Sequence, residues 1–425
     1  MAKLTVTDLN VSGQRVFVRV DFNVPMKEKD GQMVIDDVTR IQETLPTLKL
    51  LTGQGGKVVL ASHLGRPDGQ RVAGLSLGPV AVKLGEMLGR PVTFVDDCIG
   101  PKVEQAAAAL PNGGLLLLEN VRFHKEEEAN DPAFAERLAQ GAEIYVNDAF
   151  GSAHRAHAST EGVARVVARR GGPCAAGLLM ERELKFLGDE LESPARPFVV
   201  ILGGAKVSDK IQVIDRLLEK ADCLLIGGAM AYTFRLAEGR QTGKSLVEAD
   251  KAEIARNALA KARTRNVKFL LPVDDVVADP VKTDKLDKKG KPVIEYRNPR
   301  PNTDPNCPEN AAGLDIGPAT VKAYAEVIAS ARTILWNGPM GLFENKDFAA
   351  GTNAVAQAVV SATARGAKSI IGGGDSVKAL NKAGLGSQVT FMSTGGGASL
   401  EFLEGKVLPG VAALTEKRSC CVCGG

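Results

Sequence analysis

The chain has 425 residues, more than one ordinary hydrophobic core accommodates, so we expect two domains. It is 44% hydrophobic and 24% charged, as in a globular protein, and a net charge of only +3 argues against a general nucleic-acid or membrane-surface role. No apolar run approaches the ~20 residues of a membrane span, the start MAKLTVTDLN lacks a signal-peptide pattern, and the scattered cysteines favour the cytosol.

The first half alternates apolar strand patterns with helical patterns. Strands are predicted at residues 15–20, 57–61, 115–118 and 143–146, and helices lie between them, for example at 78–88 and 132–140. This alternation predicts an α/β fold with a parallel sheet and right-handed crossovers. The carboxyl ends of such strands share one edge, which is where ligands bind.

Polar residues follow these strands directly and are therefore expected along that edge. They are Asp21, Asn23, His63, Arg66, Arg122 and Arg155, and Arg40 opens a helix near the same rim. A guanidinium group can grip a carboxylate or phosphate with two hydrogen bonds. Together these residues predict a pocket for a small anion, although each arginine alone could be a solvated surface residue and His63 a packed polar residue.

Residues 173–191 carry apolar side chains at helical spacing, namely Met180, Leu184, Leu187 and Leu191. The segment SPARP at 193–197 interrupts the pattern. We expect one helix here, which connects the two domains and acts as their hinge.

Residues 197–221, PFVVILGGAKVSDKIQVIDRLLEKA, predict a buried strand, a glycine turn and an amphipathic helix with Ser208 and Asp209 in its first turn. Lys206 and Lys210 flank the turn. A helix N-terminus attracts anions, and the two added ammonium groups favour phosphate. A double-glycine turn alone is common in α/β proteins, so the interpretation depends on its repetition.

The strand-then-glycine pattern recurs through the second half. Residues 223–226 lead into GGAMAYTF, 333–335 into WNGPMGLFE, 369–371 into GGGDSVKAL and 389–392 into STGGGASLEFLEG. An edge made of backbone N–H groups and little side-chain bulk suits a nucleotide. Asp375 is the candidate ligand of a phosphate-bound Mg²⁺, or else a plain turn or cap residue, and Glu344 is a candidate for the ribose hydroxyls, or else a surface residue.

Two further segments of the second half carry other patterns. GRQTGKS at 239–245 has three residues between its glycines rather than four and no strand before it, so we reject a P-loop, and no G-x-G-x-x-G follows the first strand. Residues 279–310 are expected to form a surface excursion with a hairpin at Lys289 and Gly290.

A basic edge, a glycine edge and a hinge together indicate phosphoryl transfer between two bound substrates. Such a reaction needs positioning and charge stabilisation more than covalent catalysis. Lys206, Lys210 and Arg40 are the candidates that neutralise the moving group. No general base is evident, which is acceptable if the acceptor is already a carboxylate or a nucleotide phosphate.

Together, several long motifs resemble the phosphoglycerate kinase family, in order and from about residue 4 to residue 414. They are VDFNVP, SHLGRP, ENVRF, DAFGSAHRAHAST, GGAKVSDKI, WNGPMGLFE, GGGDSV and STGGGASLEFLEGK. The resemblance implies reversible phosphoryl transfer between 1,3-bisphosphoglycerate and ADP, giving 3-phosphoglycerate and MgATP in glycolysis. It also implies a cytoplasmic monomer of two Rossmann-like domains that close about a hinge.

The resemblance further implies roles for individual residues. For phosphoglycerate binding it implies Asp21, Asn23, Arg40, His63, Arg66, Arg122 and Arg155. For catalysis it implies Arg40, Lys206, Lys210, Gly373 and Gly396, the last within the turn 395–397. For the nucleotide it implies Lys210, Gly227, Gly228, Gly313, Asn337, Glu344, Gly373, Gly374, Asp375 and Ser376, with Asp375 at the Mg²⁺.

The expected domains follow. The phosphoglycerate domain spans 1–172, with 405–418 packing back on it, the connector spans 173–195, and the nucleotide domain spans 196–404. The tail 419–425 carries Cys420, Cys421 and Cys423 and departs from the family, as do Ala311 and Ala312 before Gly313. We expect a disordered tail, against the alternative of a metal or redox site.

Two other functions stay open at this point: a different acyl-phosphate kinase, and a catalytically idle nucleotide-binding or scaffold protein. The lysine pair, Arg40 and Asp375 speak against the idle protein.

Overall fold

The computed structural model describes residues 2–29, 31–287 and 290–417. The chain divides into two compact units, one of Met1–Lys185 with Lys406–Gly425 and one of Phe186–Gly405, called unit 1 and unit 2 below. The predicted boundaries, by comparison, lie at residues 172/173, 195/196 and 404/405. Among the residues described, no helix has the length and apolar content that crossing a bilayer requires.

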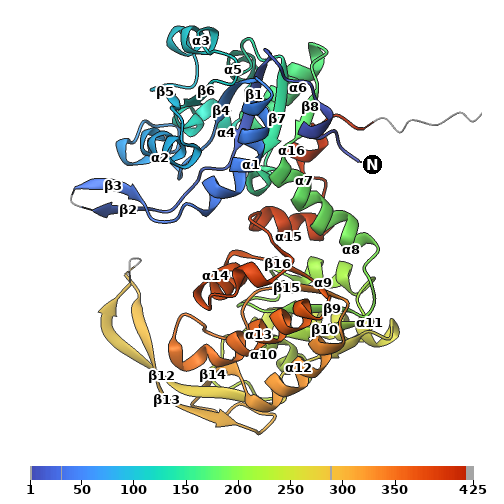
Figure 1. Ribbon diagram of the computed structural model, residues 1–425. Coiled ribbons are helices and arrows are strands. Elements are labelled where there is room, and N and C mark those ends of the chain that lie inside the picture. Colours follow the sequence, from blue (N-terminus) through green and yellow to red (C-terminus); the bar gives the residue numbers. More distant parts are fainter. Residues whose placement is uncertain (1, 30, 288–289, 418–425) are drawn as a thin grey trace, which may run out of the picture. The chain divides into compact units, whose positions relative to one another are not determined.

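Unit 1 is built on a parallel sheet of six strands in the order β5-β6-β4-β1-β7-β8 (Figure 1). Its strands are β1 (Arg15–Val20), β4 (Lys57–Ala61), β5 (Thr93–Val95), β6 (Leu115–Leu118), β7 (Ile144–Asp148) and β8 (Cys174–Ala176). On the central strand, Val18 pairs with Leu60 of β4 and with Val146 of β7. Every residue of β6 and β7 is buried, as expected for a sheet covered on both faces.

Helices and short turns surround this sheet. They are η1 (Val6–Asp8), α1 (Thr39–Gly53), η2 (Ala73–Leu75), α2 (Gly78–Leu88), α3 (Pro101–Ala108), η3 (Val121–Phe123), α4 (Lys125–Glu128), α5 (Pro132–Leu138), η4 (Phe150–Ser152), η5 (Ala158–Gly162), α6 (Val163–Arg169), α7 (Leu178–Leu184) and α16 (Pro409–Ala412). A separate antiparallel hairpin joins β2 (Met26–Lys29) to β3 (Gln32–Ile35).

Unit 2 has its own six-stranded parallel sheet, in the order β11-β10-β9-β15-β16-β17. Its strands are β9 (Phe198–Leu202), β10 (Cys223–Ile226), β11 (Lys268–Leu270), β15 (Thr333–Asn337), β16 (Lys368–Gly372) and β17 (Phe391–Met392). Counted within the unit, this is the doubly wound Rossmann order, which reverses between β9 and β15. The predicted α/β class with parallel sheets is confirmed.

A second, antiparallel sheet in unit 2 orders its strands β13-β12-β14. They are β12 (Asp275–Leu286), β13 (Pro292–Asn302) and β14 (Ala312–Ile316). The helices and turns of unit 2 are α8 (Glu190–Glu192), α9 (Ile211–Leu217), α10 (Met230–Ala237), η7 (Ala249–Lys251), α11 (Ala252–Thr264), α12 (Pro318–Ser330), η8 (Lys346–Phe348), α13 (Ala350–Ala364), α14 (Gly374–Lys382), η9 (Gly386–Gln388) and α15 (Gly397–Leu403), and η6 (Lys185–Asp189) contains the division between the units.

The prediction of one helix over residues 173–191 is wrong. Its first part is strand β8, whose buried small residues complete the edge of the unit 1 sheet beside β7. The helical part begins at Leu178 and continues through α7, η6 and α8. The apolar spacing is real, but it does not reveal that the residues before Gly177 pair with a strand.

Two other local predictions need correction. The helix after the Gly203–Gly204 turn begins at Ile211, because the backbone N–H and hydroxyl of Ser208 bond to Glu248 instead of opening a helix. Residues 279–310 are largely strand, in the long β12–β13 ribbon, rather than an irregular excursion. A hairpin is present, but the predicted turn residue Lys289 lies outside the described residues.

The segment that follows unit 2 completes unit 1. The Gly410 N–H donates to the Ala153 carbonyl oxygen, and the Thr415 N–H donates to that of Cys174, both at 2.8 Å. Leu408 and Leu414 are buried. Unit 1 is therefore made of two stretches of chain separated by the whole of unit 2.

Candidate active site

At the carboxyl edge of the unit 1 sheet, Asp21 follows β1 and Arg40 lies in the first turn of α1. Arg40 Nη1 lies 2.7 Å from Asp21 Oδ2. Burial opposes ionisation of Asp21, but the charges of Arg40 and Arg19 outweigh it and lower the pKa of this carboxyl to about 2. The ionised Asp21 holds a guanidinium whose side chain is still 35% exposed, so Arg40 retains donors for a ligand.

His63, directly after β4, is held by a cation that the sequence analysis missed. Its Nδ1 lies 3.1 Å from Nη2 of Arg19, a buried residue of β1 that also donates from Nε to Ser159 Oγ at 2.7 Å. Burial lowers the pKa of His63 well below its usual range, so the ring is neutral. Because arginine only donates, Nδ1 accepts and Nε2 keeps the proton, which makes Nε2 a donor.

Asn23 and Arg122 shape the turn that precedes Arg66. Asn23 Oδ1 accepts from the Gly65 N–H, and Arg122 Nη1 donates to the Gly65 carbonyl oxygen, both at 2.8 Å. Arg122 Nε is buried and finds no hydrogen-bond acceptor among the described residues, although it lies 3.3 Å from Glu128 in an ion pair. An unsatisfied buried donor is costly, so it is a candidate contact for an anionic ligand.

The remaining predicted residues of unit 1 lie around this group. Arg155 is half-buried and donates to His154 Nε2 at 3.2 Å. Burial lowers the pKa of Arg122, and the nearby charge of Arg155 contributes to that lowering. Arg66 is exposed beside Gly65. Contacts or charge interactions thus link every predicted residue of this edge except Arg66.

Unit 2 contains a cavity with a volume of about 540 Å³, within the usual range for small-molecule sites. Of the predicted nucleotide residues, Gly228, Gly313, Glu344 and Asp375 line it. Apolar walls come from residues including Leu246, Val247, Tyr296, Leu314, Pro339 and Leu342. Apolar walls beside side-chain-free glycines suit a flat heterocyclic base.

Lys210, at the N-cap of α9, reaches the end of β15. Its Nζ donates to Asn337 Oδ1, and it lies 3.4 Å from the Asn337 carbonyl oxygen. Burial lowers the pKa of Lys210 to about 8, although the charges of Asp209 and Asp375 oppose the shift. Asn337 Nδ2 is buried and finds no hydrogen-bond acceptor among the described residues, so it is another candidate donor to a ligand.

The N-terminus of α14 lies against the same strand end. Ser376 Oγ accepts from the Gly338 N–H at 2.6 Å, and Gly373, the N-cap, has a φ of 79°. A Cβ on Gly373 would lie 3.1 Å from Asn337 Oδ1. Lys210, Asn337 and the free N–H groups of α14 thus meet where the strand order reverses, which is the usual ligand position in this fold.

Four predicted residues lie nearby or in the other glycine turns. Gly227 is buried against Met340, Gly374 opens α14, and Gly396 caps α15 with a φ of 53°. Lys206 is exposed in the turn between β9 and α9. No contact of Lys206 or Gly396 with the cavity is among those found for the described residues.

Asp375 is the described residue best suited to a phosphate-bound Mg²⁺. Its carboxylate is exposed, lines the cavity and lies close enough to Lys210 to affect the pKa of that amine. A hard carboxylate oxygen is the kind of ligand that Mg²⁺ prefers. The residues therefore fit the ion.

The rejected GRQTGKS segment contributes to the cavity without forming a P-loop. Lys244 and Ser245 line it, the Lys244 N–H donates to the Ala311 carbonyl oxygen at 2.7 Å, and Ser245 Oγ accepts from the Gly313 N–H at 2.9 Å. No strand leads into this loop, and η7 rather than an α-helix follows it. No local signal in the sequence pairs Ser245 with Gly313, 68 residues away.

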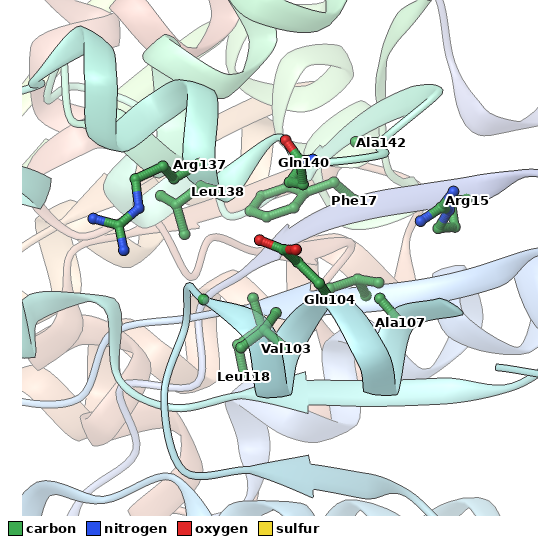
Figure 2. Close-up of a pocket in the computed structure, with 12 residues that line it drawn as sticks. Arg15, Phe17, Val103, Glu104, Ala107, Leu118, Arg137, Leu138, Gln140 and Ala142 are labelled. Carbon is green, nitrogen blue, oxygen red and sulfur yellow. The ribbon is translucent and has the colours of Figure 1, made fainter. Parts of the chain in front are cut away.

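A separate hollow in unit 1 lies between α3 and α5, with Val103, Glu104, Arg137 and Leu138 around it (Figure 2). Its volume of about 20 Å³ has room for roughly one water molecule. It is too small for a metabolite.

Comparison with known proteins gives one consistent family. The sequence matches the phosphoglycerate kinase family over residues 6–406. It is 54% identical to the phosphoglycerate kinases of Koribacter versatilis and Chloroherpeton thalassium, covering 98% of this chain and 100% of each relative. Its fold resembles that of phosphoglycerate kinase from Coxiella burnetii, with a TM-score of 0.82 and 41% identity over 97% of this chain and 98% of the other. The enzyme from Pyrococcus horikoshii gives a TM-score of 0.77 at 33% identity, with the same coverage.

Proposed function

Because the chain belongs to the phosphoglycerate kinase family, we propose that it carries out the family's reaction: reversible phosphoryl transfer between 1,3-bisphosphoglycerate and ADP, giving 3-phosphoglycerate and ATP. The observation that carries this proposal is the meeting of Lys210, Asn337 and the α14 N-terminus at the reversal point of the unit 2 sheet. Unit 1 supplies the matching group of cationic residues on its own sheet edge.

For the phosphoglycerate we propose Asp21, Asn23, Arg40, His63, Arg66, Arg122 and Arg155. Arg40 and Arg122 have guanidinium donors that the protein leaves available, and His63 can donate from Nε2. The phosphoryl acceptor is a phosphate oxygen of ADP in the direction written above and the carboxylate of 3-phosphoglycerate in the reverse direction, and both are ionised at neutral pH. A general base is therefore unnecessary, in agreement with the absence of an evident one among the residues of this edge.

For the nucleotide we propose that the base lies against Gly227, Gly228 and Gly313, with Glu344 at the ribose. The phosphates lie toward Lys210, Asn337 and residues 373–376, where backbone N–H groups and an ammonium face them. Asp375 would hold Mg²⁺, which supplies charge neutralisation between the phosphate oxygens. Lys206, Gly396 and Arg40 are proposed to follow the transferred group.

We propose that the two units close about the segment that joins them, so that the bound substrates come within reach of each other. The support is that each unit carries residues suited to only one substrate. Closure also excludes water, which would otherwise accept the phosphoryl group. We propose further that the chain works as a monomer, since each group of site residues lies within a single unit of one chain. We also propose that it works in the cytoplasm without nucleic-acid or membrane partners, which its net charge of only +3 supports.

A coupled assay tests the reaction directly. With 3-phosphoglycerate and ATP the chain should turn over only when Mg²⁺ is present, and acetate or carbamate should not replace 3-phosphoglycerate. Turnover on acetate or carbamate alone would indicate a different acyl-phosphate kinase. Nucleotide binding without turnover on any acceptor would indicate a catalytically idle protein.

A further inference from the structure

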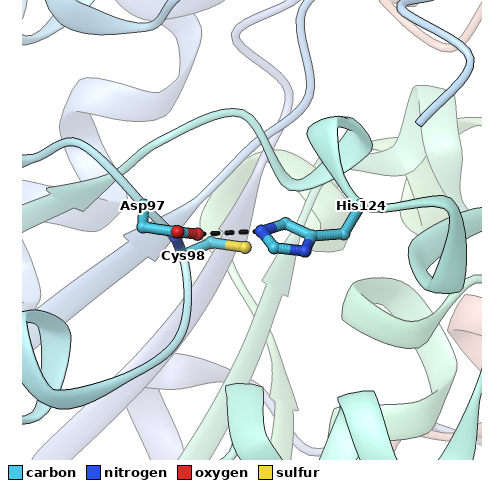
Figure 3. A group of neighbouring side chains, drawn as sticks. All are labelled: Asp97, Cys98 and His124. Atoms are coloured by element: carbon cyan, nitrogen blue, oxygen red, sulfur yellow. Dashed lines mark hydrogen bonds and ion pairs between the residues drawn. The ribbon is translucent and has the colours of Figure 1, made fainter. Parts of the chain in front are cut away.

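A group of metal-ligand side chains lies in unit 1 outside the residues assigned above. Asp97, Cys98 and His124 place a carboxylate oxygen, a thiol sulfur and an imidazole nitrogen within 4.8 Å of one another (Figure 3). Asp97 and Cys98 follow β5, and His124 follows β6 and η3, so adjacent strands bring them together. The three come from two places in the sequence that no single short motif joins.

Small movements would bring the three ligand atoms to the spacing of a metal site, since all lie within 4.8 Å of one another. His124 Nε2 lies 2.8 Å from Asp97 Oδ1, and Figure 3 shows the Cys98 sulfur directed toward the same imidazole. Bonds of about 2.0–2.3 Å to a tetrahedral ion put the ligand atoms about 3.3–3.8 Å apart. The carboxylate and imidazole would therefore separate by less than about 1 Å. The ring of Phe134, 5.2 Å from that of His124, supports the imidazole from the side.

The charges around the thiol favour a cation. The carboxylates of Asp97, Glu127 and Glu119 place negative charge near the Cys98 thiol. The same negative potential attracts a divalent ion. Arg71 opposes it, with Nη2 3.7 Å from Asp97 Oδ2, but that nitrogen is also hydrogen-bonded to the Asp96 carbonyl oxygen.

An ion can reach the site from one side. The side chains of Asp97 and His124 are 37% and 26% exposed, whereas Cys98 is 1% exposed. A metal would thus be bound between a buried sulfur and two solvent-facing ligands. Water can fill the fourth position.

We propose that Asp97, Cys98 and His124 form a binding site for a thiophilic divalent cation of the Zn²⁺ class. The mixed sulfur, nitrogen and oxygen set separates this site from the oxygen ligands that Mg²⁺ takes. On binding, a metal–sulfur bond replaces the S–H bond of Cys98, and the thiol proton leaves to solvent. A metal–nitrogen bond likewise replaces the Nε2–H bond of His124, which donates to Asp97 in the metal-free chain, and the imidazole keeps its proton on Nδ1 instead. This inference is independent of the phosphoryl-transfer site.

Co²⁺ is a suitable probe, because a cobalt–thiolate bond has a charge-transfer absorption that oxygen and nitrogen ligands do not give. The chain should be prepared with Cys420, Cys421 and Cys423 replaced by Ser, so that the tail contributes no thiolate. Titration without nucleotide should give the absorption at one Co²⁺ per chain, and Zn²⁺ should abolish it.

Three variants decide the assignment. Cys98→Ser should remove the absorption, whereas Cys174→Ser, which changes another buried cysteine of unit 1, should keep it. His124→Gln should weaken Co²⁺ binding at least tenfold. No absorption in the parent chain would overturn the proposal, as would its persistence in a folded Cys98→Ser chain. If Cys98→Ser does not fold, an unchanged Co²⁺ affinity in His124→Gln would overturn the proposal instead.

Discussion

Among single residues, Lys210 is the one that we expect to make nucleotide binding depend on pH. Its ammonium is buried against Asn337, and the pKa is lowered to about 8. Raising the pH through that value neutralises the amine in the free protein. The neutral amine attracts phosphate less, so the affinity for ADP should fall as pH rises from 7 to 9.5, which calorimetric titration without Mg²⁺ measures.

Lys210→Arg is the matched control, because arginine stays charged over this range. Its ADP affinity, whatever its absolute value, should not change with pH. A wild-type affinity that is constant up to pH 9.5 would show that Lys210 does not contact the phosphates.

Arg40 is the residue whose loss should affect turnover most. It is fixed by the ionised Asp21 and keeps exposed donors. We expect Arg40→Ala to lower kcat by about 10²–10³, the usual cost of losing one donor to a charge that grows in the transition state. Steady-state kinetics with Arg40→Lys as the comparison should give an intermediate kcat. An effect on KM alone would exclude a role in the transition state.

The site residues deduced from the sequence pattern follow a strand or open a helix, because there the position of a residue in the fold can be deduced from the pattern. Gly313 lies inside β14 and Asn337 ends β15, and only the family resemblance pointed to them. Arg19 was not predicted as a site residue, because it lies inside β1 and the strand pattern does not show that its side chain reaches the site. Ser245 escaped because its partner Gly313 is distant in the chain. Such pairings depend on tertiary packing that local patterns do not contain.

At the scale of the element, the start of α14 depends on Gly373. Its φ of 79° disfavours other residues, and an added Cβ would crowd Asn337 Oδ1. We expect Gly373→Ala to lower the free energy of unfolding by about 1–2 kcal/mol and also to weaken ADP binding. Denaturant unfolding and calorimetry measure the two effects.

Gly384→Ala is a control that separates the effect on stability from the effect on ADP binding. Gly384 has a φ of 69° just after α14, but a Cβ there meets open space. This variant should lose a similar free energy of unfolding and bind ADP normally. Equal loss of ADP affinity in both variants would mean that crowding of Asn337 is not the cause.

Buried parallel strands were the elements best predicted from sequence, because a short apolar run followed by glycine or polar residues has few other interpretations. The β12–β13 ribbon was not, since β12 is buried only in its first residues and then carries lysine and aspartate, and β13 is mostly exposed and contains three prolines. Strand β8 was missed because it directly precedes residues with helical spacing and was assigned to the same helix. In both cases pairing with a neighbouring strand decided the conformation.

For the whole molecule, the proposed closure predicts a change of size. Small-angle scattering should show a smaller radius of gyration with 3-phosphoglycerate and MgADP together, a combination that cannot react. Either ligand alone should give little change, because closure needs contacts to both. An unchanged radius in the ternary complex would argue against hinge closure as the step that joins the substrates.

The two-domain α/β organisation could be predicted because each half repeats its own strand-and-helix pattern around a distinct kind of edge. The exact residues at which the units begin and end could not be predicted from the sequence. The division falls within η6, in the middle of a continuous helical stretch, where neither composition nor a breaking residue marks it.

The two-part construction of unit 1 constrains how the chain is made. Translation delivers residues 186–405 before the segment 406–417 that pairs with Cys174, Ala153 and Leu4. The sheet of unit 1 can form early, but the hydrogen bonds to residues 406–417 must wait until unit 2 has been synthesised. The nascent amino-terminal half therefore keeps the surface that residues 406–417 will cover exposed through the synthesis of more than 200 later residues.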